Sequence, residues 1–118
     1  MAQYLPRYSA PSFGLVAAAA ITGGQLVNAT GNPATAGDTA VVGVAGHDVV
    51  IGGQVTVFHN SVQRPVAAAT ITAGQIVKAA VNGQVTPYTS GTDSADSRVG
   101  VALTGGAAGA QVDVLFER

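Results

Sequence analysis

Two histidines, a serine and an aspartate are the residues of this sequence that could most readily do chemistry. His47 precedes Asp48, and His59 lies two positions before Ser61. A serine, a histidine and a carboxylate can form a nucleophilic triad, and histidines with a carboxylate can hold a metal ion. We expect His47 at the start of one strand and His59 at the end of a neighbouring strand, so the two rings could lie close together.

The spacing around these residues favours a structural interpretation. No serine stands in the Gly-x-Ser-x-Gly pattern of a nucleophile elbow, and the chain has two histidines and no cysteine to ligate a metal. The carboxylates fall in expected turns or on outward faces, where solvation explains them better than a glycosidase pair or a weak cation site. We therefore predict no catalytic residue, no metal site and no cofactor. The six carboxylates are Asp38, Asp48, Asp93, Asp96, Asp113 and Glu117.

The motifs of a phosphate-binding loop and of a carrier domain are also missing from the sequence. The glycine-rich stretches contain no Gly-x-Gly-x-x-Gly that opens a helix and no Gly-Lys-Ser/Thr ending, so a phosphate-binding loop is not indicated. A biotinyl or lipoyl carrier domain shares small duplicated β halves and needs a lysine at a hairpin tip. The single lysine, Lys78, falls inside an expected strand. The carrier interpretation therefore fails.

Composition describes a small, weakly charged domain. The 118 residues fit one domain, with 47% hydrophobic residues that are largely Ala and Val, 5% aromatics and 9% charged residues. Small side chains favour a thin all-β core. A charge-poor surface loses little solvation energy when another protein covers it. The formal net charge is −1, and the cations are dispersed, so we expect no nucleic-acid partner. These cations are Arg7, Arg64, Lys78, Arg98 and Arg118.

The apolar stretches are too short for a membrane or an export signal. The longest, Leu15 to Ile21, has seven residues and cannot span a bilayer. The Ala-rich run after Arg7 is interrupted by the polar segment from Tyr8 to Ser12 and is too weakly apolar for a signal peptide. We therefore expect no membrane partner and an unexported protein.

An internal repeat organises the chain. Ala17 to Asn28 (AAAAITGGQLVN) matches Ala67 to Lys78 (AAATITAGQIVK) at eight of twelve positions, at an offset of 50. Val-Gly-Val-Ala then occurs at 42–45 and 99–102, and Gly-x-Gln-Val-x-Val at 52–57 and 109–114, both at an offset of 57. Repeats of this kind indicate duplicated structural units. We place the two copies at 17–58 and 67–116, with seven extra residues in the second.

Each copy has the pattern of short strands. Val55 and Val57 alternate with Thr56, the period of two of a half-buried strand, and Gly and Asn clusters mark turns. Glycine inside Val-Gly-Val indicates a bulge, a bend or a close backbone approach, as at the corner of a small barrel. We also expect strands at Val16 to Ala20 and Ala67 to Thr70. The fold class is therefore all-β, a small barrel built from two sequence-related halves.

Two segments outside the repeat could contact a partner. Residues 1–13 carry two prolines and aromatics without core periodicity, so we expect an extended arm before a single β domain at 14–118. The insertion at 83–97 contains a solvated loop, 89–94, beside Tyr88. The predicted contact residues are Tyr4, Leu5, Arg7, Tyr8, Phe13 and Tyr88.

The ordered blocks resemble a known family. Ile-Thr-Gly-Gly-Gln-Leu-Val (21–27), Val-Val-Gly-Val-Ala (41–45) and Gly-Gly-Gln-Val-Thr-Val (52–57), together with their second copies, are similar to the head decoration or capsid cement proteins of bacteriophages. The resemblance covers about Ala17 to Phe116. It implies a small β-barrel or β-tulip-like domain without enzymatic activity, made in the host cytoplasm and bound on the outer capsid surface. It also implies that the protein bridges major capsid subunits, often as a homotrimer.

Other functions remain open at this point. The chain could be another phage structural accessory of the tail or fibre, which self-assembly without a capsid would distinguish. It could be a carbohydrate-binding β module, although such modules usually stack sugars on Trp or Tyr and this chain has no Trp. An enzyme with an unfamiliar site is the last alternative.

Overall fold

The computed structural model describes residues 12–117, which form short strands, two single 3-10 turns and connecting loops. Within this range no helix is long and apolar enough to cross a bilayer. The all-β class is confirmed. The elements are β1 (Ser12–Val16), β2 (Leu26–Asn28), β3 (Val41–Ala45), β4 (Gln54–Phe58), β5 (Val62–Gln63), β6 (Ile76–Ala79), η1 (Val81–Gly83), β7 (Val85–Pro87), η2 (Ala95–Ser97), β8 (Arg98–Ala102) and β9 (Val114–Phe116).

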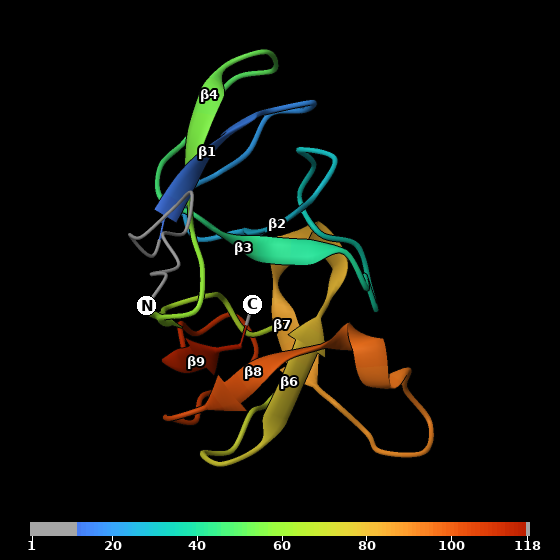
Figure 1. The fold of residues 1–118 in the computed structure, drawn as a ribbon. Coiled ribbons are helices and arrows are strands. Elements are labelled where there is room, and N and C mark those ends of the chain that lie inside the picture. The colour runs from blue at the N-terminus through green and yellow to red at the C-terminus, as the bar shows by residue number, and fades with distance from the viewer. Residues whose placement is uncertain (1–11, 118) are drawn as a thin grey trace, which may run out of the picture.

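The strands form two sheets that follow one another along the chain (Figure 1). The first half, residues 12–58, has the order β1-β4-β3-β2, and the second half, residues 62–117, has the order β5-β9-β8-β6-β7. All the pairings between these strands are antiparallel. The second sheet therefore has the order of the first, with β7 added at its edge. No closed barrel forms in the described part of the chain, so the barrel expected from the Val-Gly-Val corners is not the form that the sheets take.

The Val-Gly-Val segments produce a bulge in each sheet. The register of β2 with β3 shifts between Val27 and Asn28, and the register of β6 with β8 shifts between Val77 and Lys78. A Cβ atom on Gly43 would lie 2.3 Å from the Phe58 carbonyl oxygen. The predicted bulge and close backbone approach are both present, and they bend each sheet without closing it.

The strand expected over the alanine-rich leads is wrong for most of their length. β1 ends at Val16, and Ala17 exchanges two backbone hydrogen bonds with the turn before β4, from its N–H to Gly53 O and from Gly52 N–H to its own carbonyl. Ala67 makes the corresponding pair in the second half. The chain then turns away, with Ala18 N–H donating to Gly31 O. Small side chains let the backbone cross close to its neighbours here, which β propensity alone does not reveal.

Two buried clusters fill the molecule. The smaller lies inside the first half, and includes Val27, Val55 and Val57. The larger contains the inner face of the second sheet and also Leu26, Val41 and Val44 of the first half. Since each fully buried side chain of this size contributes about 1.5–3 kcal/mol, the larger cluster is the main attachment between the halves. The first sheet is therefore buried on both faces around β3, whereas the second sheet has one open face.

The insertion of the second half is more ordered than expected. It contains β7 and η2, and Ser97 within η2 is buried. Asp93 in its loop accepts the Thr89 N–H and forms an ion pair with Lys78 of β6. The strand β7 could not be predicted from the sequence, because Val-Thr-Pro is too short to show a period of two.

Candidate docking surfaces

The residues that could have formed a triad or a metal site make structural hydrogen bonds instead. His47 donates from Nδ1 to the Asp48 carbonyl and accepts the Thr56 N–H at Nε2, with distances of 3.0 and 3.2 Å. The Asp48 carboxylate accepts the Gly23 N–H at 2.8 Å. Both ring nitrogens of His47 are thus engaged with the backbone. The hydrogen bond between Asp48 and Gly23 holds the turn before β4 against the segment before β2.

His59 lies apart from that turn and contacts an aromatic ring. Its imidazole packs against Phe13 of β1, with centroids 5.4 Å apart and planes tilted by 53°. Ser61 accepts a hydrogen bond from the Gln63 side chain. In the described range no group of three or more His, Cys, Asp or Glu side chains is placed to hold a metal ion.

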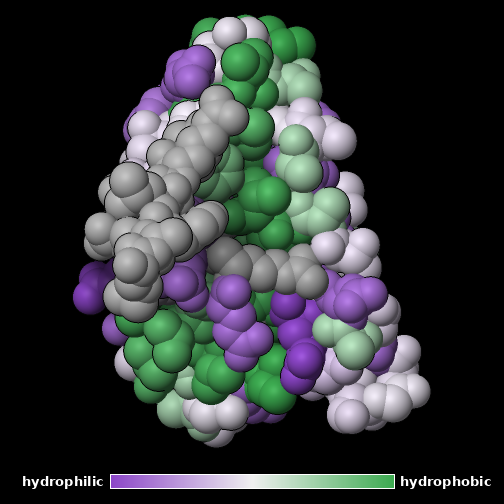
Figure 2. Space-filling model, in the orientation of Figure 1, coloured by the Kyte–Doolittle hydropathy of each residue, from purple (hydrophilic) through white to green (hydrophobic). Residues whose placement is uncertain are grey.

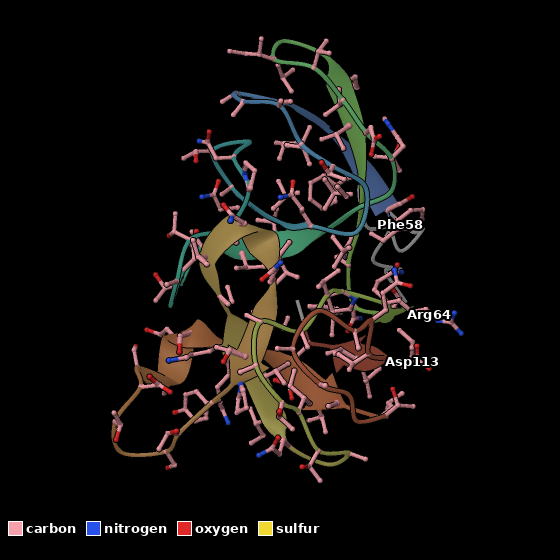
Figure 3. All side chains as sticks on the ribbon, turned by 180° about the vertical axis from the view of Figure 1, so that it is seen from behind. Phe58, Arg64 and Asp113 are labelled. Atoms are coloured by element: carbon pink, nitrogen blue, oxygen red, sulfur yellow. The ribbon has the colours of Figure 1, made fainter. Side chains whose placement is uncertain are left out.

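The carboxylates also have structural partners. Asp113 accepts from Arg64 at 2.9 Å, and Figure 3 shows this pair at the edge of the second sheet. Burial raises the pKa of Asp38, but hydrogen bonds from Asn28 and from backbone N–H groups outweigh burial and hold the pKa below its ordinary value. The Lys78 side chain, followed by the Thr89 N–H, lowers the pKa of Asp93. These charges stabilise loops and strand edges.

The predicted contact residues are only partly described by the structure. Tyr4, Leu5, Arg7 and Tyr8 lie outside the described residues, and Phe13, assigned to the arm, belongs to β1 and is half-buried. Tyr88 follows β7 and is half-buried, with the Arg98 guanidinium 5.9 Å from its ring centroid. Such a cation–π contact fixes the ring at the surface. Tyr88 and Phe13 lie on different sheets.

An exposed apolar tip, missed by the sequence analysis, stands at one end of the first half. Val16, Val50 and Ile51 are 60%, 74% and 70% exposed, at the end of β1 and in the turn between β3 and β4. Hydrogen bonds between Ala17 and residues 52–53 hold these segments together. The turn stands at the top of Figure 1, where Figure 2 shows hydrophobic surface. We call these three residues the apolar tip.

A second apolar surface crosses the open face of the second sheet. Leu115 pairs with Val62 on one side and with Val101 on the other, and Val101 pairs with Ile76. Directly paired residues point to the same face, so these side chains form one continuous row. Tyr88 extends it, because its N–H donates to Ile76 O. Figure 2 shows hydrophobic surface at the lower left, over β9 and β8. We call Val62, Leu115, Val101, Ile76 and Tyr88 the outer row.

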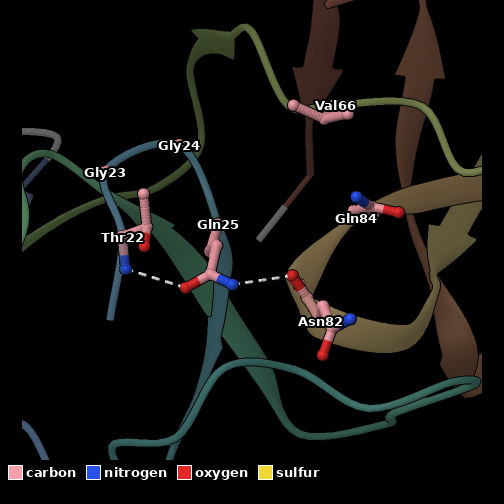
Figure 4. Close-up of a pocket in the computed structure, with 8 residues that line it drawn as sticks. Thr22, Gly23, Gly24, Gln25, Val66, Asn82 and Gln84 are labelled. Carbon is pink, nitrogen blue, oxygen red and sulfur yellow. Dashed lines mark hydrogen bonds between the residues drawn. The ribbon is translucent and has the colours of Figure 1, made fainter. Parts of the chain in front are cut away.

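A crevice of about 230 Å³ lies where the halves meet (Figure 4). Gln25 crosses it: its Oε1 accepts the Thr22 N–H at 2.8 Å, and its Nε2 donates to the Asn82 carbonyl at 2.9 Å. Gly83 lines the same crevice at φ +67°, where a Cβ atom would lie 2.8 Å from Leu26 O. The residues that line the crevice include no ionisable side chain. The hydrogen bond from Gln25 to Asn82 crosses it and joins the two halves.

These surfaces define a class of protein before any relative is considered. The apolar tip and the outer row are contiguous exposed apolar patches on a charge-poor body, and such patches are typical of protein interaction sites. The arrangement is that of a small, charge-poor β module with exposed apolar surfaces.

Comparison with known proteins identifies the family. The model of the phage cement protein family matches residues 10–117, so the chain belongs to that family. No curated protein sequence matches the chain. Among solved structures, the N-terminal base of head fibre gp8.5 of bacteriophage phi29 is similar, with a TM-score of 0.68, 20% identity, and coverage of 90% of this chain and 92% of that one. This likeness supports the fold. The chain is thus a phage structural protein associated with the capsid.

Proposed function

We propose that this protein binds the outer surface of a phage capsid and stabilises the shell by bridging neighbouring major capsid subunits. Membership of the cement family supports capsid association. A ligand that binds only the assembled shell stabilises it by mass action, and many copies multiply the effect. The protein acts by covering area on several subunits and needs no enzymatic activity.

The observation that carries the proposal is the apolar tip. The corresponding turn of the second half has Ala107 and Ala108 where the first half has Val50 and Ile51, and both turns close with the same backbone hydrogen bonds. The fold therefore does not require large apolar residues at the tip. Exposing them costs solubility, and covering them with a capsid subunit would recover about 25 cal/mol per Å² of apolar surface.

The residues predicted from the sequence belong to the same proposal. We assign the arm residues Tyr4, Leu5, Arg7 and Tyr8, together with Phe13 at the start of β1, to a second capsid contact. Two separate contacts would let one copy bridge two subunits. Tyr88, on the other sheet, is assigned to a neighbouring copy or to the capsid, and a trimer is the assembly that the family resemblance favours.

Co-sedimentation with capsids tests the proposal. Expanded shells assembled from the major capsid protein and freed of accessory proteins should bind the full chain saturably, at a fixed ratio to capsid subunits. Bound shells should also resist heating better than bare shells. The double variant V50A/I51A, which gives the tip the side chains of the other half, should bind more weakly. Val81→Ala is the matched control, because Val81 is 58% exposed and lies away from the tip.

The outcomes separate the possibilities. Absence of saturable binding to expanded shells would overturn the proposal. Equal binding by the tip variant and the control would remove the tip from the contact while leaving the arm to be tested by deletion of residues 1–11. Binding without any change in the heat resistance of the shell would favour a second function, a fibre base, which the similarity to the phi29 head fibre base suggests.

A further inference from the structure

The first sheet begins with an edge strand, β1, whose outer backbone groups are unpaired. β1 pairs with β4, and Gly14 lies opposite Thr56. Thr56 directs its N–H and its carbonyl to the other side, toward residues 46–47 after β3. Because hydrogen-bonded and non-bonded pairs alternate along an antiparallel ladder, Gly14 and Ser12 direct their N–H and C=O groups away from β4. Among the described residues these groups have no hydrogen-bond partner, and Gly14 is exposed.

The matching edge of the second sheet is protected by its sequence. Arg64 stands at the position of Gly14, and Pro65 at that of Leu15, both at an offset of 50. The edge strand there, β5, has only two residues, whereas β1 has five. Short length, a charged side chain and proline are the devices by which sheets keep an edge strand from pairing with another chain. β1 contains no charged residue and no proline, so its edge is available for pairing.

The side chains of β1 define what a partner strand must carry. Phe13 and Leu15 pack on the small cluster of the first half and are only half-buried, since no described strand lies outside β1. Apolar side chains at alternate positions of an added strand would lie beside them. The outward N–H and C=O groups of Ser12 and Gly14 require an extended backbone. The edge therefore fits an extended peptide segment with apolar side chains at every second position.

We infer that β1 receives an extended segment of a major capsid subunit, which adds as a fifth strand to the four-stranded first sheet. In this mode of recognition the main-chain hydrogen bonds supply affinity, and the alternate side chains supply specificity. Val16, at the end of β1, belongs to the apolar tip, and Phe13 belongs to the contact assigned with the arm. A strand along β1 thus adjoins both surfaces proposed to meet the capsid. The inference rests on the proposed function and names the element that makes the contact.

Hydrogen exchange on expanded shells tests the inference at single residues. In the free protein the amide of Gly14 should exchange freely, whereas the amides of Phe13 and Leu15, which face β4, should be protected. Exchange is then repeated on the shell, and the protein is quenched and dissociated before the amides are read. Bound protein should show protection of Gly14 as well.

Two variants at Gly14 isolate the outward N–H. Gly14→Pro removes it without removing a bond to β4, and Gly14→Ala keeps it. Both add a Cβ atom that meets the flexible end of the Gln54 side chain, so Gly14→Ala controls for that contact. Gly14→Pro should bind expanded shells at least about tenfold more weakly than Gly14→Ala, because the added segment would keep an unpaired carbonyl. Ser12→Pro removes the other outward N–H and should weaken binding in the same direction. Thermal unfolding verifies that each variant is folded.

The outcomes distinguish this inference from the proposed function. Saturable binding of the wild type with an unprotected Gly14 amide, or equal binding by the two Gly14 variants, would overturn strand addition without affecting the proposed capsid function. Absence of wild-type binding would overturn both. Protection of Gly14 already in the free protein would also overturn the inference. Loss of that protection on deletion of residues 1–11 would assign the edge to the arm, and loss on dilution would assign it to a second copy.

Discussion

The two halves of this molecule share several backbone hydrogen bonds and differ in which side chains they expose. Gly24 N–H donates to Ala45 O as Gly74 N–H donates to Ala102 O, and Thr22 and Thr72 each bond a glutamine three residues on. The exposure of matching side chains is not shared: Leu26 is 0% exposed, whereas Ile76, at the matching position of the second half, is 38% exposed. The residues that occur in both halves are thus those that the sheet, the turn and the bulge require. The burial of the other side chains depends on which part of the molecule packs against them.

The largest expected loss of stability follows replacement of the glycine in the Val-Gly-Val segment, which both halves require. Gly100→Ala would place a Cβ atom 2.2 Å from the Leu115 carbonyl oxygen, and Gly43→Ala would create the same clash with Phe58 O. The clash is with backbone, which cannot rotate away, so each change should lower the free energy of unfolding by about 3 kcal/mol or prevent folding. Urea unfolding measures it. A loss below about 1 kcal/mol at either site would show that the bulge can relax.

The next largest effect is a difference in stability between truncation of Leu26 and truncation of Ile76, its counterpart in the outer row. Leu26→Ala removes a side chain that is 0% exposed, and should cost about 2–5 kcal/mol of stability. Ile76→Ala, at the matching position, removes one that is 38% exposed and should cost less than about 1 kcal/mol in the monomer. Urea midpoints of the two variants give the comparison. Equal losses would mean that the two side chains are equally buried in solution, for example by assembly, and dilution would then separate the two values.

A smaller difference is expected between the two glutamines. Gln25→Ala and Gln75→Ala each remove the hydrogen bond to a threonine N–H, but only Gln25 also donates to Asn82 across the junction. The net value of one such bond is about 0.5–1.5 kcal/mol, so Gln25→Ala should be less stable than Gln75→Ala by that amount. Thermal melts of the two variants, recorded side by side, measure the difference. A less stable Gln75→Ala would contradict the role of Gln25 as the cross-half contact.

The sequence predicts what is local and repeated. Alternation of Val55 and Val57 with polar residues predicts β4, and glycine between two valines predicts the bulge of each sheet, because these features depend on neighbours in the chain and on the adjacent strand. The all-β class follows from them. The sequence also predicts, correctly, that Lys78 lies within a strand.

The sequence cannot predict which copy of a face is covered. Leu26 and Ile76 occur in nearly identical segments, Gly-Gln-Leu-Val and Gly-Gln-Ile-Val, and differ only in what the fold places on them. The apolar tip could not be predicted for a related reason: nothing in the sequence distinguishes Val50 and Ile51 from buried apolar residues, and only the position of the turn leaves them exposed. The outer row was missed because it combines one residue from each of several strands, so no stretch of sequence contains it.

The smallest expected effect concerns acid. Asn28 and Lys78 occupy matching positions; Asn28 donates to Asp38, and Lys78 pairs with Asp93. The pKa values of both aspartates lie below their ordinary value of 3.8. Their stabilising contribution is therefore present above about pH 4 and is lost as the pH falls through the lowered pKa values. Urea midpoints between neutral pH and pH 3 should fall for the wild type, and should fall less for Asp38→Asn and Asp93→Asn.

The two asparagine variants sharpen the comparison between the halves. Asparagine has the same shape as aspartate. The change in urea midpoint at neutral pH therefore measures the contribution of the charge, and the change in the slope with pH measures the contribution of protonating that aspartate. If Asp93→Asn flattens the acid dependence and Asp38→Asn does not, the ion pair of the second half is the acid-sensitive element, and the ionisation of Asp38 adds little to the stability of the first half. A wild-type stability that rises on acidification would contradict the lowered pKa of both groups, since protonation would then favour the folded state.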